Sequence, residues 1–171
     1  MIRPFELQDA EALYRLHGDP EVTRYAGGTK TRDESRSALL RIIDRVSSSG
    51  FGALALQQNV SGDVIGWCGI QRMRDFDEYE VLYALATPNW GQGLAYEAAA
   101  ALMAVAFETD SPRLERICGL VFPQNIRSIR VLEKLGMHFV RDHLDQGSGK
   151  HTYLYSISRV RFIERHSSSS K

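Results

Sequence analysis

The sequence predicts a mixed α+β fold in one domain, with an antiparallel group of strands and one parallel strand–helix–strand step. The first observation is size: 171 residues, 43% of them hydrophobic, suffice for one filled core and are too few for two domains. The second is the order of patterns, in which two helical stretches precede a run of strands, and helices and strands then interchange. We therefore expect residues 1–160 to form a single domain.

The first part of the chain predicts two helices. Apolar residues recur at helical spacing between positions 9 and 17, and Pro20 ends that helix because proline disfavours helical geometry in the residue before it. A second helix is expected over 31–46, where Thr31 and Glu34 can form a capping box.

After residue 50 the chain changes between strand and helix patterns. Turn residues at 59–62 separate the first two strands, Gly136 ends the last helix, and Gly147 and Gly149 form the turn of a final hairpin. The polar tail at 161–171 is expected to be disordered. The expected elements are strands at 52–57, 64–73 and 80–86, a helix at 94–108, a strand at 116–122, a helix at 125–135, and strands at 137–143 and 151–157.

Composition argues against several classes of protein. With 21 basic and 21 acidic residues, the chain lacks the basic excess that a nucleic-acid binder usually carries. Cys68 and Cys118 lie in apolar runs, which favours buried free thiols over a disulfide framework or a catalytic role. The first residues lack an apolar signal region, and the longest apolar run, 98–107, is shorter than the roughly 20 residues that span a bilayer. We expect a cytoplasmic protein with no membrane or nucleic-acid partner.

The segment at 87–98 is the most informative part of the sequence. It follows a predicted strand and opens an alanine-rich helix, and Gly91 and Gly93 permit backbone conformations closed to other residues. Successive N–H groups at the positive end of a helix bind anions, so the expected ligand is a phosphate or pyrophosphate. A Walker A loop is excluded because no Gly-Lys-Ser/Thr is present, and a dinucleotide fingerprint because Tyr96 replaces its small residue. An ordinary glycine-rich turn is the alternative.

A second strand-to-helix segment lies at 123–137. Asn125 is well placed to cap the helix, and Ser128 lies one turn further along the same face. Taken alone, these two are a cap and a surface residue.

Together the two segments resemble the GNAT superfamily of acetyl-CoA-dependent N-acyltransferases, and most of all the branch typified by the RimJ and RimL ribosomal-protein N-terminal acetyltransferases. The resemblance covers nearly the whole chain, with departures at Leu82, where the branch has glycine, and Tyr96, where it has threonine. Its motifs are Asp19-Pro20-Glu21-Val22, Arg24-Tyr25, Ile65-Gly66, Cys68-Gly69, Trp90-Gly91-Gln92-Gly93-Leu94-Ala95, Arg116-Ile117, Asn125-x-x-Ser128 and Leu135-Gly136-Met137.

The resemblance implies a mixed central sheet flanked by helices and splayed between its fourth and fifth strands, with acetyl-CoA in the wedge. The pantetheine arm would pair with the backbone at 84–87, and the pyrophosphate with N–H groups at 91–96, in agreement with the anion site expected from the glycines. No metal is implied. The implied cofactor-binding residues are Leu85, Thr87, Gly91, Gln92, Gly93, Ala95, Tyr96, Asn125 and Ser128.

Two side chains are the implied catalytic groups. Ser128 would serve the departing CoA thiolate, because the tyrosine that many superfamily members carry one turn later is replaced by Leu132. Glu80 would accept the proton of the attacking amine, and a backbone N–H near Leu85 would stabilise the oxyanion. Glu80 can equally be a solvated strand-end carboxylate, and His138 is a weaker candidate base. A nearby acidic cluster can instead attract a cationic amine; its members are Asp75, Asp77 and Glu78.

We therefore expect an N-acetyltransferase that moves the acetyl group of acetyl-CoA to a primary amine by direct attack in a ternary complex. The acceptor is either a protein N-terminus or a small amine, such as an amino acid, a polyamine or an aminoglycoside. The alternative from another class is a non-catalytic acyl-CoA-binding regulatory module with the same fold. Similar enzymes often form dimers, so a homodimer is the assembly that the resemblance suggests.

Overall fold

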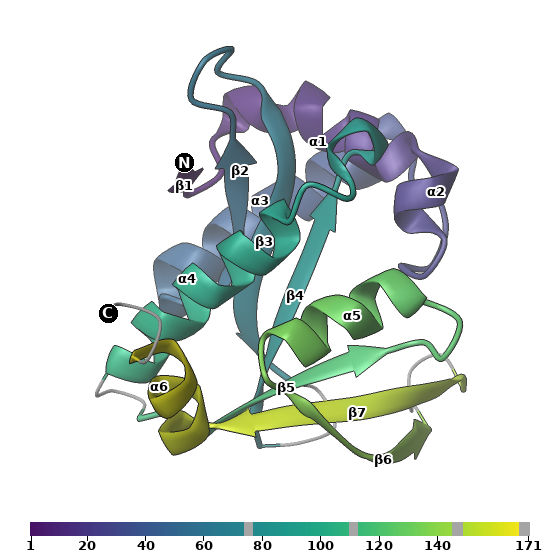
Figure 1. Ribbon diagram of the computed structural model, residues 1–171. Coiled ribbons are helices and arrows are strands. Elements are labelled where there is room, and N and C mark those ends of the chain that lie inside the picture. The colour runs from purple at the N-terminus through teal and green to yellow at the C-terminus, as the bar shows by residue number, and fades with distance from the viewer. Residues whose placement is uncertain (74–76, 110–112, 145–148, 168–171) are drawn as a thin grey trace. The chain divides into compact units, whose positions relative to one another are not determined.

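The computed structural model describes residues 1–73, 77–109, 113–144 and 149–167. The strands are β1 (Ile2–Arg3), β2 (Gly52–Gln57), β3 (Val64–Arg72), β4 (Tyr79–Leu85), β5 (Arg116–Val121), β6 (His138–Leu144) and β7 (His151–Ser158). The helices are η1 (Leu7–Asp9), α1 (Ala10–Gly18), α2 (Pro20–Thr23), α3 (Arg32–Ser49), η2 (Thr87–Asn89), α4 (Leu94–Glu108), α5 (Ile126–Lys134) and α6 (Arg159–Ser167). The strands are hydrogen-bonded in the order β1-β2-β3-β4-β5-β7-β6, which makes a mixed sheet of the α+β class (Figure 1).

The chain divides into two compact units. Unit 1 consists of Met1–Gly69 and Leu82–Ala98, and unit 2 of Ile70–Val81 and Ala99–Lys171. Strands β3 and β4 and helix α4 each pass from one unit into the other.

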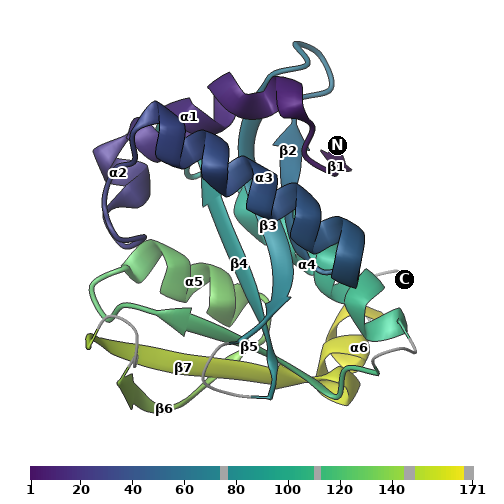
Figure 2. The same cartoon turned by 180° about the vertical axis from the view of Figure 1, so that it is seen from behind.

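Unit 1 is built from the first three helices and the strands β1 to β3. Helix α3 packs against α1 and against β2, and Figure 2 shows it lying across the strands. Its capping box is confirmed: the Thr31 N–H donates to Glu34 Oε2 at 2.7 Å, and the Glu34 N–H donates to Thr31 Oγ1 at 3.3 Å. The helix ends at Gly50, whose φ of 72° is left-handed. The core of this unit contains Phe5, Leu13, Leu16, Leu39 and Ala55.

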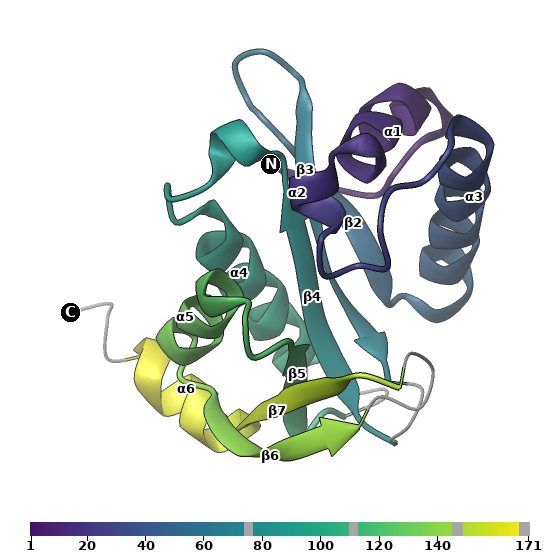
Figure 3. The same ribbon diagram turned by 90° about the vertical axis from the view of Figure 1, so that its right-hand side faces the viewer.

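Unit 2 is built around β5, β7 and β6, which pair antiparallel. Helix α5 contacts β5, and α6 contacts β7 (Figure 3). The ring of Phe162 on α6 lies 5.2 Å, centroid to centroid, from the ring of Phe107 at the end of α4. Both side chains are buried, so α6 is part of the core of this unit.

The parallel step predicted from the sequence is confirmed. Strand β4 and strand β5 pair parallel, with Tyr79 opposite Ile117 and Glu80 opposite Cys118, and α4 connects them. The ladder covers these two pairs at the start of both strands, and from Leu82 onward β4 belongs to unit 1.

The expected disordered tail is wrong for residues 161–167, which continue helix α6. Phe162 is 2% exposed and its ring stacks on that of His166, so the segment gains a buried anchor that its polar composition hides. The short elements β1 and α2 were also not expected. Gly147 of the expected hairpin turn, Asp75 of the acidic cluster and residues 168–171 of the tail lie outside the described residues. Within the described part of the chain, no helix combines the length and apolar character needed to cross a bilayer.

Candidate functional site

The turn between β4 and α4, in unit 1, is fixed by its own hydrogen bonds. The Ala86 N–H donates to the Ile65 carbonyl at 2.8 Å, which ties the end of β4 to β3. The Trp90 backbone N–H donates to Thr87 O at 3.2 Å, and its indole Nε1 donates to Leu85 O at 2.7 Å. The indole bond was not predicted from the sequence.

The two glycines of this turn adopt the backbone conformations that the sequence predicts. Gly91 has a φ of 78° and Gly93 a φ of 80°, both left-handed, and both residues are exposed. Gly93 is the N-cap of α4, since the Glu97 N–H donates to its carbonyl at 3.0 Å. A glycine has no side chain with which to cap the first amides of a helix, so these amides are suited to an anion.

Two more predicted cofactor residues are held by polar contacts in the same turn. Gln92 Nε2 donates to Pro88 O at 3.0 Å, and Thr87 Oγ1 lies 3.4 Å from Asp19 Oδ2. The other oxygen of Asp19 accepts from the Glu21 N–H at 2.8 Å and so caps α2. One carboxylate thus links the start of α2 to the start of η2. An aspartate before Pro20 is itself a helix-start signal that sequence reasoning can use.

In unit 2, the structure brings Asn125 and Ser128 together as predicted. Asn125 is the N-cap of α5, and its Oδ1 accepts from the Ser128 N–H at 3.2 Å. The cap uses the side-chain oxygen, which leaves the amide nitrogen of Asn125 to donate to a ligand. Leu132, at the place of the missing tyrosine, is 2% exposed and packs over Gly119 of β5.

Glu80 lies on β4, and its side chain projects from the face of the β4–β5 pair that α5 does not cover. Its Oε1 accepts from Gln71 Nε2 at 2.9 Å, and its Cα is paired with that of Cys118. Gly119 faces α5, so Cys118 and its neighbour Glu80 point away from that helix. The structure therefore does not bring Glu80 and Ser128 together. Within unit 2 they lie on opposite faces of the sheet.

The acidic residues beside Glu80 are largely engaged. Glu78 accepts a hydrogen bond from the Cys118 thiol at 2.7 Å and lies 3.6 Å from the Arg116 guanidinium, while Asp77 pairs with Arg72. Burial, and then the Glu78 carboxylate, raise the pKa of the Cys118 thiol far above its usual range. Burial also raises the pKa of Cys68, to about 12. Both cysteines are free and buried, as predicted.

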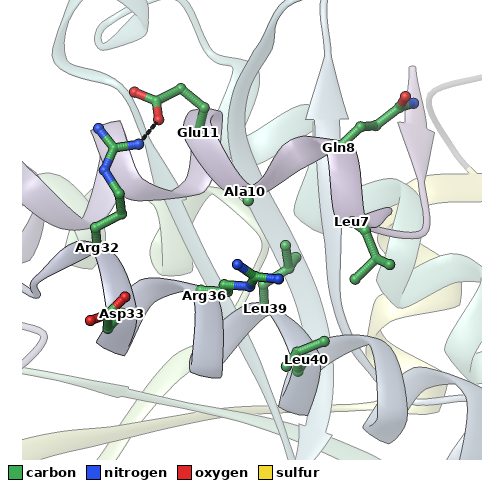
Figure 4. Close-up of a pocket in the computed structure, with 9 residues that line it drawn as sticks. All are labelled: Leu7, Gln8, Ala10, Glu11, Arg32, Asp33, Arg36, Leu39 and Leu40. Carbon is green, nitrogen blue, oxygen red and sulfur yellow. Dashed lines mark hydrogen bonds and ion pairs between the residues drawn. The ribbon is translucent and has the colours of Figure 1, made fainter.

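A pocket of about 450 Å³ lies elsewhere in unit 1, between α1 and α3 (Figure 4). Leu7, Leu40 and Arg36 line it, and so do Arg32 and Glu11, which form an ion pair. None of the predicted cofactor or catalytic residues lines this pocket.

Comparisons with known proteins extend over most of the chain. The sequence profile described as "Acetyltransferase (GNAT) domain" matches residues 1–138. The uncharacterized N-acetyltransferase p20 of Bacillus licheniformis is 30% identical over 166 residues, covering 94% of this chain and 92% of p20. The solved acetyltransferase of Agrobacterium tumefaciens str. C58 is 28% identical, with a TM-score of 0.77 over 91% of this chain and 88% of that one. The aminoglycoside acetyltransferase AAC(6′)-Ib, solved with coenzyme A, shares the fold at 17% identity and a TM-score of 0.79, over 96% and 97% of the two chains.

Proposed function

The chain belongs to the acetyltransferase (GNAT) family, and on that basis we propose that it transfers the acetyl group of acetyl-CoA to a primary amine. The observation that carries the proposal is the turn before α4. Two left-handed glycines lead into a helix whose N-cap has no side chain, so backbone amides are left to bind an anion. The pyrophosphate of CoA is the anion that the family membership suggests.

The cofactor would be bound mainly by backbone groups. The amides at 91–96 would receive the pyrophosphate, with Gly91, Gln92, Gly93, Ala95 and Tyr96 around it, and the backbone at Leu85 and Thr87 would pair with the pantetheine arm. Asn125 supports this proposal with a free amide donor, because its side-chain oxygen is already used by the helix cap. AAC(6′)-Ib, a structure of similar fold, was solved with coenzyme A.

The reaction needs a base for the amine, donors for the oxyanion and a donor for the departing thiolate. Glu80 would take the proton of the amine, because the hydrogen bond from Gln71 fixes the orientation of its carboxylate. The Leu85 N–H would stabilise the oxyanion, and the Ser128 hydroxyl would donate to the thiolate. The amine nitrogen and the thioester sulfur are both bonded to the acetyl carbon in the intermediate, so the two roles require Glu80 and Ser128 to reach that carbon from the opposite faces on which they lie.

The proposed acceptor is a protein N-terminus, as in the RimJ/RimL-like branch. One support is the set of motifs that begins at Asp19-Pro20. Another is Trp90, a residue ordinary for this branch, whose indole N–H donates to the Leu85 carbonyl and so has a structural role here. A small amine is the second candidate, favoured by the fold shared with an aminoglycoside acetyltransferase. A non-catalytic acyl-CoA-binding module would keep the turn and need neither Glu80 nor Ser128.

The test measures acetyl-CoA binding by calorimetry and thiol release with a panel of amines. The panel contains peptides with alanine or serine N-termini, spermidine and an aminoglycoside. Turnover with peptides would support the N-terminal acceptor, and turnover with one small amine would replace it. Binding without turnover by any member would favour the non-catalytic module, and no binding would overturn the proposal.

A further inference from the structure

Strand β3 comes unusually close to β4 at Gly66. A Cβ added at this position would lie 2.9 Å from Leu85 Cα and 2.6 Å from Leu85 Cδ2, and closer still to the Ala84 carbonyl oxygen. Two of these three atoms belong to the backbone, which cannot turn aside as a side-chain end can. A glycine inside a strand often marks such a close approach of another backbone.

The contact with Gly66 is made by the end of β4, where the proposed function has the acetyl-bearing arm of the cofactor bind. Ala84 and Leu85 are the contacted residues, and the next amide, that of Ala86, donates to the carbonyl of Ile65 beside Gly66. Gly66 is buried and its φ is not positive, so backbone strain does not explain its presence. The lack of a side chain at this place is what allows the contact.

We propose that Gly66 is a positioning residue: by having no Cβ, it lets β3 hold the backbone of Ala84–Ala86 where the acetyl-bearing arm of acetyl-CoA binds. The inference rests on the proposed function. A displacement of reacting groups by about 1 Å can lower activity by about 100-fold, so a backbone shift forced by one methyl group is large enough to matter.

Gly69 offers a matched control in the same strand. It too is buried without a positive φ, and its added Cβ would lie 2.7 Å from Ala53 Cα, against the backbone of β2 and away from β4. Gly66→Ala and Gly69→Ala therefore impose the same kind of clash on opposite neighbours of β3. A merely structural role predicts the same consequences for both variants.

The experiment compares wild type, G66A and G69A by thermal unfolding, by acetyl-CoA calorimetry and by kcat/KM per folded molecule. The calorimetric stoichiometry counts the folded molecules. We expect both variants to melt at lower temperature, with kcat/KM down about 100-fold in G66A and within about threefold of wild type in G69A. Equal losses in the two variants, or an unchanged G66A, would overturn the inference. A wild-type protein without binding or turnover would overturn the proposed function instead.

If G66A does not fold, hydrogen exchange of the wild-type protein answers the same question. If β3 holds the backbone of Ala84–Ala86, the Ala86 amide should exchange slowly in the cofactor-free protein, at nearly the rate seen with saturating acetyl-CoA. An Ala86 amide that exchanges fast until acetyl-CoA is added would show that β3 does not hold the stretch, and would overturn the inference.

Discussion

The chain makes two strand-to-helix turns. In both, the carbonyl of the N-cap residue accepts from the N–H four residues later, but the N-cap residue itself differs. Before α4, the carbonyl of the N-cap Gly93 accepts from the Glu97 N–H at 3.0 Å, and before α5 that of the N-cap Asn125 accepts from the Ile129 N–H at 3.0 Å. The Asn125 side chain accepts from one amide of the first turn of its helix, that of Ser128, and Gly93 has no side chain to do the same. The comparison teaches that the N-cap residue supplies a side-chain acceptor at one helix start and none at the other.

The largest expected effect comes from placing a charge at the uncapped start. Gly93→Asp should abolish acetyl-CoA binding in calorimetry, because a carboxylate and a side chain would then stand against the pyrophosphate, at a φ of 80°. Gly50→Asp is the control, since Gly50 is exposed at a φ of 72° and ends α3. The control should cost about 1 kcal/mol of stability and leave binding intact. A dissociation constant unchanged in Gly93→Asp would remove the anion site.

At the capped start, the hydroxyl of Ser128 can be removed without touching the cap. The bond to Asn125 uses the backbone N–H of Ser128, which Ser128→Ala retains. We expect kcat to fall by about 100-fold with little change in acetyl-CoA affinity, as for the loss of a positioned proton donor. Steady-state kinetics and calorimetry check this together, and a wild-type kcat would rule out the role in thiolate departure.

Two substitutions at Asn125 separate capping from ligand binding. Asn125→Asp keeps the oxygen that accepts from the Ser128 N–H and loses the amide donor, so stability should hold while the acetyl-CoA dissociation constant rises about tenfold. Asn125→Ala loses both and should also cost about 1 kcal/mol in urea unfolding. If the aspartate variant binds acetyl-CoA like wild type, the amide of Asn125 does not reach the cofactor.

The last expected effect concerns folding rather than the ligand, and is a loss of stability in acid within unit 1. Burial, and then the charge of Lys30, lower the pKa of His17 from 6.5 to about 4, and its Nδ1 lies 2.9 Å from Ser35 Oγ. Because the unfolded chain takes up this proton first, stability should decline as the pH falls from 6.5 to 4. The Arg3 guanidinium lowers the pKa of Asp9, so a further loss should follow below the usual carboxyl range.

Urea unfolding at pH 7, 5.5 and 4.5 measures the first of these losses. His17→Asn stays neutral throughout and should flatten the decline between pH 7 and 4.5. An equal decline in the wild type and the variant would mean that other groups cause it.

The features that the sequence predicts well depend on residues that are close together in the chain. Helix α4 has the predicted bounds of 94–108, and α5 was found from Asn125 and Gly136, because caps and left-handed glycines act over a few neighbouring residues. The family resemblance made Glu80 and Ser128 candidates, although no pattern of spacing predicts that they lie on opposite faces of the strands. That fact depends on the pairing of Glu80 with Cys118, a contact between distant parts of the chain.

The features that were missed depend on long-range contacts. The link from Asp19 to Thr87 joins residues 68 positions apart, and β1 exists only because Ile2 and Arg3 pair with β2. Helix α6 had a readable signal in Phe162 and His166 at helical spacing, which the serine-rich tail after it concealed.

The burial of Cys68 and Cys118 has a practical consequence for the thiol-release assay named above. Both side chains are 0% exposed and both thiols have raised pKa values, so neither presents a thiolate to a disulfide reagent in the folded protein. Colour from such a reagent during turnover will therefore come from released CoA alone. In a variant that unfolds, the same reagent will detect two additional equivalents per chain, one from each cysteine. A single spectrophotometric trace can therefore distinguish a catalytic defect from a loss of native protein.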